Sequence, residues 1–103
     1  MRIISRRALR EFWGIHPTAK DPLTAWHRVM RSAVFTDFHG IHKAFGTADY
    51  VAPYTVFDVG GNKYRVIAVI HYNRHRVYIR HVFTHADYDR WSYERQKRKR
   101  SKR

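Results

Sequence analysis

The sequence has 103 residues, a formal charge of +13 at pH 7, 44% hydrophobic residues and no cysteine. A chain of this length forms one domain and buries a core without covalent staples, and its apolar content excludes a wholly disordered protein. The lack of cysteine excludes thiolate metal sites and thiol nucleophiles. Since the sequence contains neither a long apolar helix nor a signal-peptide pattern, we expect a cytoplasmic protein whose acidic partner is nucleic acid rather than a membrane.

The positive charge is concentrated near the C-terminus. Residues 1–89 carry 13 Lys and Arg against 7 Asp and Glu, whereas residues 90–103 carry 8 against 1. A segment this basic repels itself and has little to bury, so we expect a single domain over residues 1–91 and a flexible basic tail over residues 92–103. Such a tail strengthens RNA binding through counterion release.

Two amphipathic helices are predicted in the N-terminal third. Ser5 is placed to cap a helix over residues 6–14, which ends before a proline. Asp21 is the expected N-cap of the second helix, with Pro22 at its first position. The apolar residues at helical spacing are Leu9, Phe12 and Trp13 in the first helix and Leu23, Trp26, Val29 and Met30 in the second.

The flanking segments have weaker patterns. Residues 1–4 begin apolar and suit an edge strand. Residues 34–53 suggest a short helix that is interrupted at Gly40 and ends at Gly46, followed by a loop that includes Asp49.

An antiparallel meander of three strands is predicted from Thr55 onward. Gly60-Gly61-Asn62 suits a turn that needs positive φ, and Asn73-Arg74-His75 suits a second one. The expected strands are residues 55–59, 64–72 and 77–84.

Alternation places Arg65 on the opposite face of its strand from Tyr64. Uninterrupted alternation in the last strand groups Val77, Ile79, His81, Phe83 and His85 on one face. Which face of this strand lies with Arg65 depends on the register of pairing.

Three segments resemble the HigB branch of the RelE-type toxins of bacterial toxin–antitoxin systems, namely ISRRALREFW, TVFDVGGNKYRVIA and RVYIRHVFTHADYD. The resemblance covers nearly the whole chain up to about Trp91. It implies a RelE-like α+β fold in which N-terminal helices pack on a small, mainly antiparallel sheet of three to four strands, with a short C-terminal helix. It also implies ribosome-dependent cleavage of messenger RNA without metal. The implied partner is a cognate HigA-type antitoxin with a DNA-binding helix-turn-helix domain. The resemblance implies that the toxin contacts operator DNA only through this antitoxin.

The resemblance implies roles for individual residues. Arg65, in GGNKYRVIA, matches an arginine that contacts the scissile phosphate, with Lys63 nearby. His85 and Tyr88, in THADY, match the basic or histidine residue and the tyrosine that close the site. Residues 55–59 lack the dense Lys and Arg run of the RelE pattern, which leaves the general base open.

RNA cleavage through its own 2′-hydroxyl needs a base for that proton, cations for the charge on phosphorus and an acid for the departing 5′-oxygen. Histidine suits proton transfer because its usual pKa is about 6.5, and arginine suits the phosphate. We therefore expect His85 as acid or base, Arg65 as the phosphate clamp and Tyr88 as a stacking or proton-transfer residue. The residues expected to hold the RNA backbone are Lys63, Arg76 and Arg80.

Each of these residues also has a purely structural interpretation. His85 can simply begin the last helix, and Tyr88 can simply pack. Arg65 and Arg80 can be solvated residues of a half-exposed sheet. Arg76 begins its strand near the second turn, so it can equally lie at the end of the meander away from the site.

A metal site is not predicted. His81 and His85 lie four residues apart on one strand face, about 13 Å, which is too far to share an ion. His39 and His42 can meet on a helix, but no acidic partner lies at ligand spacing.

Two other functions fit the composition. A noncatalytic RNA-binding or ribosome-associated protein would use the basic charge and the aromatic residues for stacking. A ParE-like poison of DNA gyrase would share the scaffold but not the RNase residues.

Overall fold

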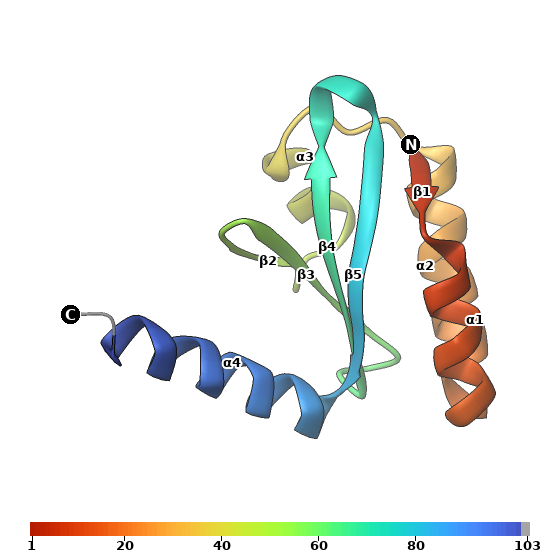
Figure 1. Ribbon diagram of the computed structural model, residues 1–103. Coiled ribbons are helices and arrows are strands. Elements are labelled where there is room, and N and C mark those ends of the chain that lie inside the picture. The colour runs from red at the N-terminus through yellow and green to blue at the C-terminus, as the bar shows by residue number, and fades with distance from the viewer. Residues whose placement is uncertain (102–103) are drawn as a thin grey trace.

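The computed structural model describes residues 1–101 (Figure 1). Side chains are described through Lys97. In chain order the elements are β1 (Arg2–Ile4), α1 (Arg6–Ile15), a 3-10 turn (Pro17–Ala19), α2 (Lys20–Ser32), α3 (Phe38–Ala44), β2 (Asp49–Val51), β3 (Tyr54–Val59), β4 (Tyr64–His71), a 3-10 turn (Tyr72–Arg74), β5 (Arg76–Thr84) and α4 (His85–Ser101). The predicted α+β class is confirmed.

The strands of the described chain form one sheet in the order β1-β5-β4-β3-β2. β3, β4 and β5 are the predicted antiparallel meander. The predicted edge strand at the N-terminus is confirmed, and it pairs parallel with β5. The sheet has five strands rather than three to four, because Asp49–Val51, predicted as a loop, pairs antiparallel with β3.

The turn between β3 and β4 has the left-handed backbone that its residues favour. Gly60, Gly61 and Asn62 have φ angles of 67°, 61° and 79°. A Cβ at Gly60 would lie 3.0 Å from the ring of Tyr64 and 3.3 Å from Pro22, whereas a Cβ at Gly61 would meet nothing within 4 Å. The predicted turn is confirmed, and it packs closely against the helices only at Gly60.

Replacing Gly60 by alanine is expected to lower the free energy of unfolding more than the same change at Gly61. Both substitutions force a residue with a Cβ into positive φ, which costs about 1–2 kcal/mol. Only G60A also crowds a buried ring. Urea denaturation of the two variants measures the difference, and equal losses would contradict the close packing at Gly60.

A bulge in β5 changes which of its residues share a face. Ile67 of β4 pairs with His81, whereas the next residue, Ala68, pairs with Ile79. Arg80 is therefore an extra residue without a partner in β4.

The prediction of uninterrupted alternation in the last strand was wrong for this reason. Ile79 lies on the face of the sheet that the helices cover. His81 and Phe83 lie on the opposite, open face, because Phe83 pairs directly with Arg65. The bulge thus supplies two aromatic rings to the face that carries Arg65.

The hydrophobic core lies between the helices and the covered face, where α1 and α2 run alongside the sheet (Figure 1). The rings of Trp26 and Phe45 each pack edge-on against Phe57, with centroids 5.2 Å apart. Val29, predicted in this core, is 43% exposed, because the buried stripe of α2 runs through Leu23, Trp26 and Met30. The core packing occupies the covered face of the sheet. The opposite face is not covered by α1 and α2 and can hold the functional side chains.

Two helix starts differ from the sequence prediction. α2 begins at Lys20, directly after the turn Pro17–Ala19, so Asp21 lies in its first turn rather than at its N-cap. An acidic residue is favourable in both positions, because it faces the positive end of the helix dipole. Asp37 caps α3 by accepting a 3.0 Å hydrogen bond from the backbone of Gly40, which lies inside the helix instead of interrupting it.

The C-terminal helix is longer than predicted, since α4 has 17 residues and continues into the basic segment. Thr84 accepts a 3.2 Å hydrogen bond from the backbone N–H of Asp87 and so caps its start. The helix then extends away from the sheet (Figure 1). The flexibility of residues 92–103 stays a prediction, and Lys102 and Arg103 lie outside the described residues.

None of the described helices has both the length and the apolar character of a membrane span.

Candidate active site

Arg65, His85 and Tyr88 lie together where the β3–β4 turn meets the start of α4. Arg65 is the second residue of β4, His85 is the first residue of α4, and Tyr88 follows about one turn later. The backbone N–H of His85 donates a 3.0 Å hydrogen bond to the carbonyl of Lys63, which ties the helix to the turn. The structure therefore brings together the three residues predicted as catalytic, with Lys63 beside them.

Arg65 uses all of its five N–H donors inside the protein. Its Nε lies 2.8 Å from the carboxylate of Asp58. Nη1 donates to the carbonyls of Asn62 and Tyr64 at 3.1 and 3.2 Å, and Nη2 contacts Asn62 Oδ1 at 2.7 Å and His85 Nδ1 at 3.0 Å. The side chain is only 8% exposed. The alternative of a solvated surface arginine is therefore wrong for this residue.

His85 does begin α4, and its ring also has a defined orientation. Since a guanidinium group has only N–H donors, Nδ1 of His85 must accept from Arg65, and a neutral ring then carries its proton on Nε2. Nε2 lies 3.2 Å from the carboxylate of Asp89. The side chain is 51% exposed, so a substrate can reach it.

Tyr88 packs beneath the guanidinium group. The centre of its ring lies 5.4 Å from the Cζ atom of Arg65, which is a cation–π distance. Burial, followed by the negative charge of Asp49, raises the pKa of the Tyr88 phenol. The phenol is therefore protonated at neutral pH and is a proton donor.

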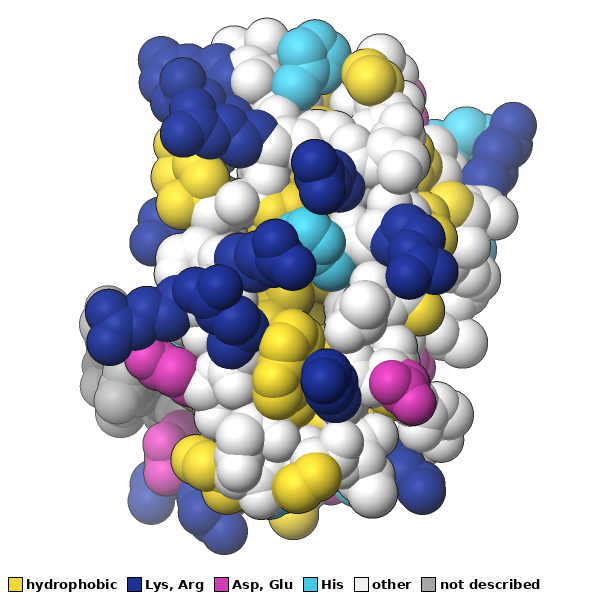
Figure 2. Space-filling view, turned by 90° about the vertical axis from the view of Figure 1, so that its right-hand side faces the viewer, with side chains coloured by type: hydrophobic (Ala, Val, Ile, Leu, Met, Phe, Trp, Pro, Cys, Tyr) yellow, Lys and Arg dark blue, Asp and Glu magenta, His cyan; other side chains and the backbone are white. Residues whose placement is uncertain are grey.

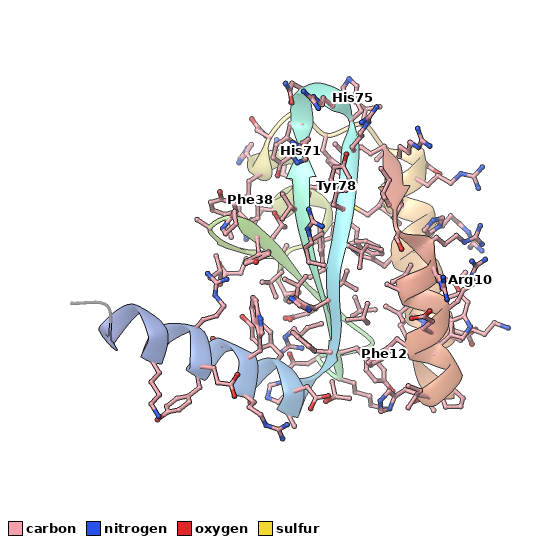
Figure 3. All side chains as sticks on the ribbon, viewed as in Figure 1. Arg10, Phe12, Phe38, His71, His75 and Tyr78 are labelled. Carbon is pink, nitrogen blue, oxygen red and sulfur yellow. The ribbon has the colours of Figure 1, made fainter. Side chains whose placement is uncertain are left out.

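The remaining predicted RNA contacts are not part of this cluster. Arg80 lies at the bulge, where its guanidinium group is 5.5 Å from the ring of Tyr78. Arg76 begins β5 at the opposite end, roughly 25–30 Å along the strand from His85. Figure 3 labels Tyr78, His71 and His75 toward that far end of the sheet.

The sequence analysis missed three residues that hold the cluster. Asp58 is the only charged residue of its strand, and Asp89 lies four residues after His85 on a helix, a spacing at which side chains meet. Asn62 was seen only as a turn residue. The lone charge in β3 and the helical spacing of Asp89 are visible in the sequence. The strand register that places Asp58 opposite Arg65 cannot be predicted from the sequence.

A hollow of about 450 Å³ opens beside the cluster. It is lined by Thr47, Asp58, Gly61 and Asn62, two of which hold Arg65 in place. A group bound there would lie next to the residues that orient the guanidinium group.

An aromatic group extends the site along the open face. The ring of Trp91 in α4 lies 5.4 to 6.0 Å, between centroids, from four other rings, those of Tyr54, His81, Phe83 and Tyr88. Burial, and then the charge of Arg80, lowers the pKa of His81.

Within residues 1–101 no group of three potential ligands is placed to hold a metal ion.

The α+β fold, with two helices on one face of the sheet and a C-terminal helix at the other face, fits the RelE-like class of toxins. A family described as the HigB toxin, the RelE-like toxic component of a toxin–antitoxin system, matches residues 19–91. The "mRNA interferase toxin HigB" of Escherichia coli K12 is 32% identical over 92 residues, covering 86% of this chain and 88% of its own. An "mRNA interferase HigB" of Escherichia coli O6:H1 is 33% identical over 93 residues, with 87% and 90% covered.

The chain belongs to the HigB toxin family. As a member of a family of toxic components, it pairs with an antitoxin.

Proposed function

We propose that this protein is a toxin that stops translation by cutting messenger RNA on the ribosome. It is an endoribonuclease that uses the 2′-hydroxyl of the RNA as nucleophile and needs no metal. The curated relatives named as mRNA interferases support the activity. The observation that carries the proposal is the contact of Arg65, His85 and Tyr88 at one accessible end of the sheet.

The observed hydrogen bonds suggest how catalysis begins. Neither nitrogen of His85 is free to take a proton, because Nδ1 accepts from Arg65 and Nε2 of the neutral ring carries the proton. A scissile phosphate offers Arg65 a stronger, charged acceptor than an imidazole nitrogen. In the proposal, Nη2 of Arg65 leaves His85 for a phosphate oxygen, and this exchange frees Nδ1 as the general base.

The positions of these groups support the following chemical step. Nδ1 of His85 takes the proton of the 2′-hydroxyl, and the 2′-oxygen bonds to phosphorus while the bond to the 5′-oxygen breaks. Arg65 stabilises the charge on the phosphate oxygens, and Asp89 stabilises the imidazolium through Nε2. The products are a 2′,3′-cyclic phosphate and a 5′-hydroxyl, whose proton comes from the phenol of Tyr88 or from water.

The binding residues divide into two groups by position. Lys63, exposed in the turn beside His85, holds the RNA backbone near the cut. Arg80 and Arg76 lie farther along the sheet and would hold more distant phosphates. The aromatic rings around Trp91 provide stacking surfaces for unpaired bases.

The partners follow from the same proposal. The protein acts in the cytoplasm on messenger RNA held by the ribosome. Its antitoxin is of the HigA type, with a helix-turn-helix domain, and operator DNA is contacted only through that antitoxin. Because the toxin has a charge of +13, an acidic segment of the antitoxin would speed association.

Induced expression with mapping of messenger 5′ ends tests the function. Translated messengers should gain new ends within minutes, and cleavage in vitro should require ribosomes and persist in excess chelator. Arrest of replication with intact messengers would instead support gyrase poisoning. RNA binding without cleavage or growth arrest would support a noncatalytic protein.

A further inference from the structure

Two adjoining hollows lie between α1, α2 and β1, on the helical side of the molecule. The first has a volume of about 260 Å³ and the second about 270 Å³, and they share Arg6, His27 and Arg31. The first is completed by Thr24, Arg28 and Ser32, and the second by Met1, Arg2 and Ile3. Four arginines from three elements therefore line the two adjoining hollows, which together are called the helical hollow.

Among the described residues, the arginines of the helical hollow have no acidic partner. Within the described part of the chain, the side chains of Arg2, Arg6, Arg28 and Arg31 form no ion pair and no hydrogen bond. Arg7 of α1, by contrast, is paired with Glu11 at 2.7 Å. Figure 2 shows this side of the molecule, where Lys and Arg side chains spread over the surface and acidic ones stay near its margins.

The charges act on a partly buried histidine at the centre. Burial, followed by the charges of Arg6 and Arg31, lowers the pKa of His27. The positive charges of Arg6 and Arg31 disfavour protonation of His27, and an anion bound beside them would offset this effect.

The lining favours phosphate over an acidic peptide. All residues of the first hollow are polar, with guanidinium forks and the hydroxyls of Thr24 and Ser32 as donors. These groups match the oxygens of a phosphate. Protein–protein interfaces are instead centred on apolar or aromatic anchors, which the first hollow does not offer.

The helical hollow is separate from the candidate active site. α1 and α2 pack on the sheet face that carries Phe57 and Tyr64. α4 and its Trp91 pack on the opposite face, beside Phe83. One extended messenger strand on the open face does not explain a phosphate site behind the sheet.

We propose that the helical hollow binds backbone phosphates of a folded RNA, as a second RNA contact independent of the messenger strand at the active site. The RNA identity of the ligand rests on the proposed function, whereas the phosphate site itself does not. A protein that binds RNA on both sides of its sheet fits into a pocket of folded RNA rather than on an isolated strand. Removing this second contact would weaken docking without altering the chemistry of cleavage.

Titration of His27 by NMR tests the phosphate site directly. Inorganic phosphate should raise the pKa of His27 in a saturable way, because it adds negative charge beside the ring. The double variant Arg28→Gln/Arg31→Gln should lose this phosphate response. The matched control is Arg10→Gln/Lys20→Gln, which removes the same two positive charges. Both residues lie outside the linings of the hollow, with Arg10 on the outer side of α1 (Figure 3). No saturable shift, or an equal loss in the control, would overturn the proposal.

A second measurement identifies the source of the phosphate. In an inactive His85→Asn background, binding of a duplex RNA is measured against salt concentration. The Arg28→Gln/Arg31→Gln variant should weaken binding and lower the salt slope by about one for each phosphate that it no longer neutralises, whereas the Arg10→Gln/Lys20→Gln control, with the same loss of charge, changes the slope less. Unchanged RNA binding together with reduced binding to phosphatidylserine vesicles would overturn the RNA assignment in favour of a membrane. Since neither measurement requires cleavage, failure of the proposed nuclease activity is recognised separately.

Discussion

Replacing His85 by asparagine is expected to reduce messenger cleavage by about 10²–10⁴-fold, the usual contribution of a positioned proton-transfer group. The asparagine oxygen takes the place of Nδ1 and still accepts from Arg65, so the variant keeps the fold but has no titratable group. Cleavage of a ribosome-bound messenger, followed by primer extension, measures the loss. Binding to the antitoxin should remain unchanged.

The control for this variant is His75→Asn. His75 is exposed in the turn before β5 and has a φ of 53°, a conformation that asparagine tolerates well. This variant should cleave like the wild type. Asp89→Asn provides a graded comparison, since an exposed partner of His85 should contribute only about two- to fivefold. Full growth inhibition by the His85→Asn variant would remove His85 from the mechanism.

Replacing Arg65 by methionine is expected to abolish cleavage and to lower the free energy of unfolding by about 3–5 kcal/mol, because it leaves the partly buried carboxylate of Asp58 without its cation. Urea denaturation measures the stability. Arg80→Met is the matched control. Arg80 is an exposed arginine on the same sheet and should change stability by less than about 0.5 kcal/mol.

A second change separates the two roles of Arg65. Adding Asp58→Asn to Arg65→Met removes the unpaired charge and should recover part of the stability, giving a measurable coupling between the two sites. Cleavage should not recover, because the phosphate still has no cation beside it. Recovery of cleavage along with stability would mean that Arg65 only supports the fold.

The meander was predictable because its signals are local. The turn Gly60-Gly61-Asn62 has the residues that positive φ requires, and β-branched residues mark the strands on both sides. The two N-terminal helices were equally visible from their apolar spacing. By contrast, β2 has three residues and no local pattern of its own, and it is a strand only because β3 lies beside it.

The residues of the candidate site were predictable from the sequence, but the hydrogen bonds and contacts between them were not. His85 and Tyr88 are close in sequence, but their contact with Arg65 depends on the pairing of β4 with β5 across 20 residues. The bulge at Arg80 depends on that pairing as well, because an extra residue in one strand leaves no trace in its composition.

The sequence by itself determined the class of this protein, its cationic character and the residues capable of phosphate and proton chemistry, because composition, turn residues and motifs are properties of the chain. Only the tertiary structure decided that Arg65 is held by Asp58 and Asn62, that its fifth donor fixes the ring of His85, and that four arginines line adjoining hollows on the helical side. The reason is physical: hydrogen bonds and charge clusters between distant segments exist only once strand register and helix packing bring those segments within a few ångströms.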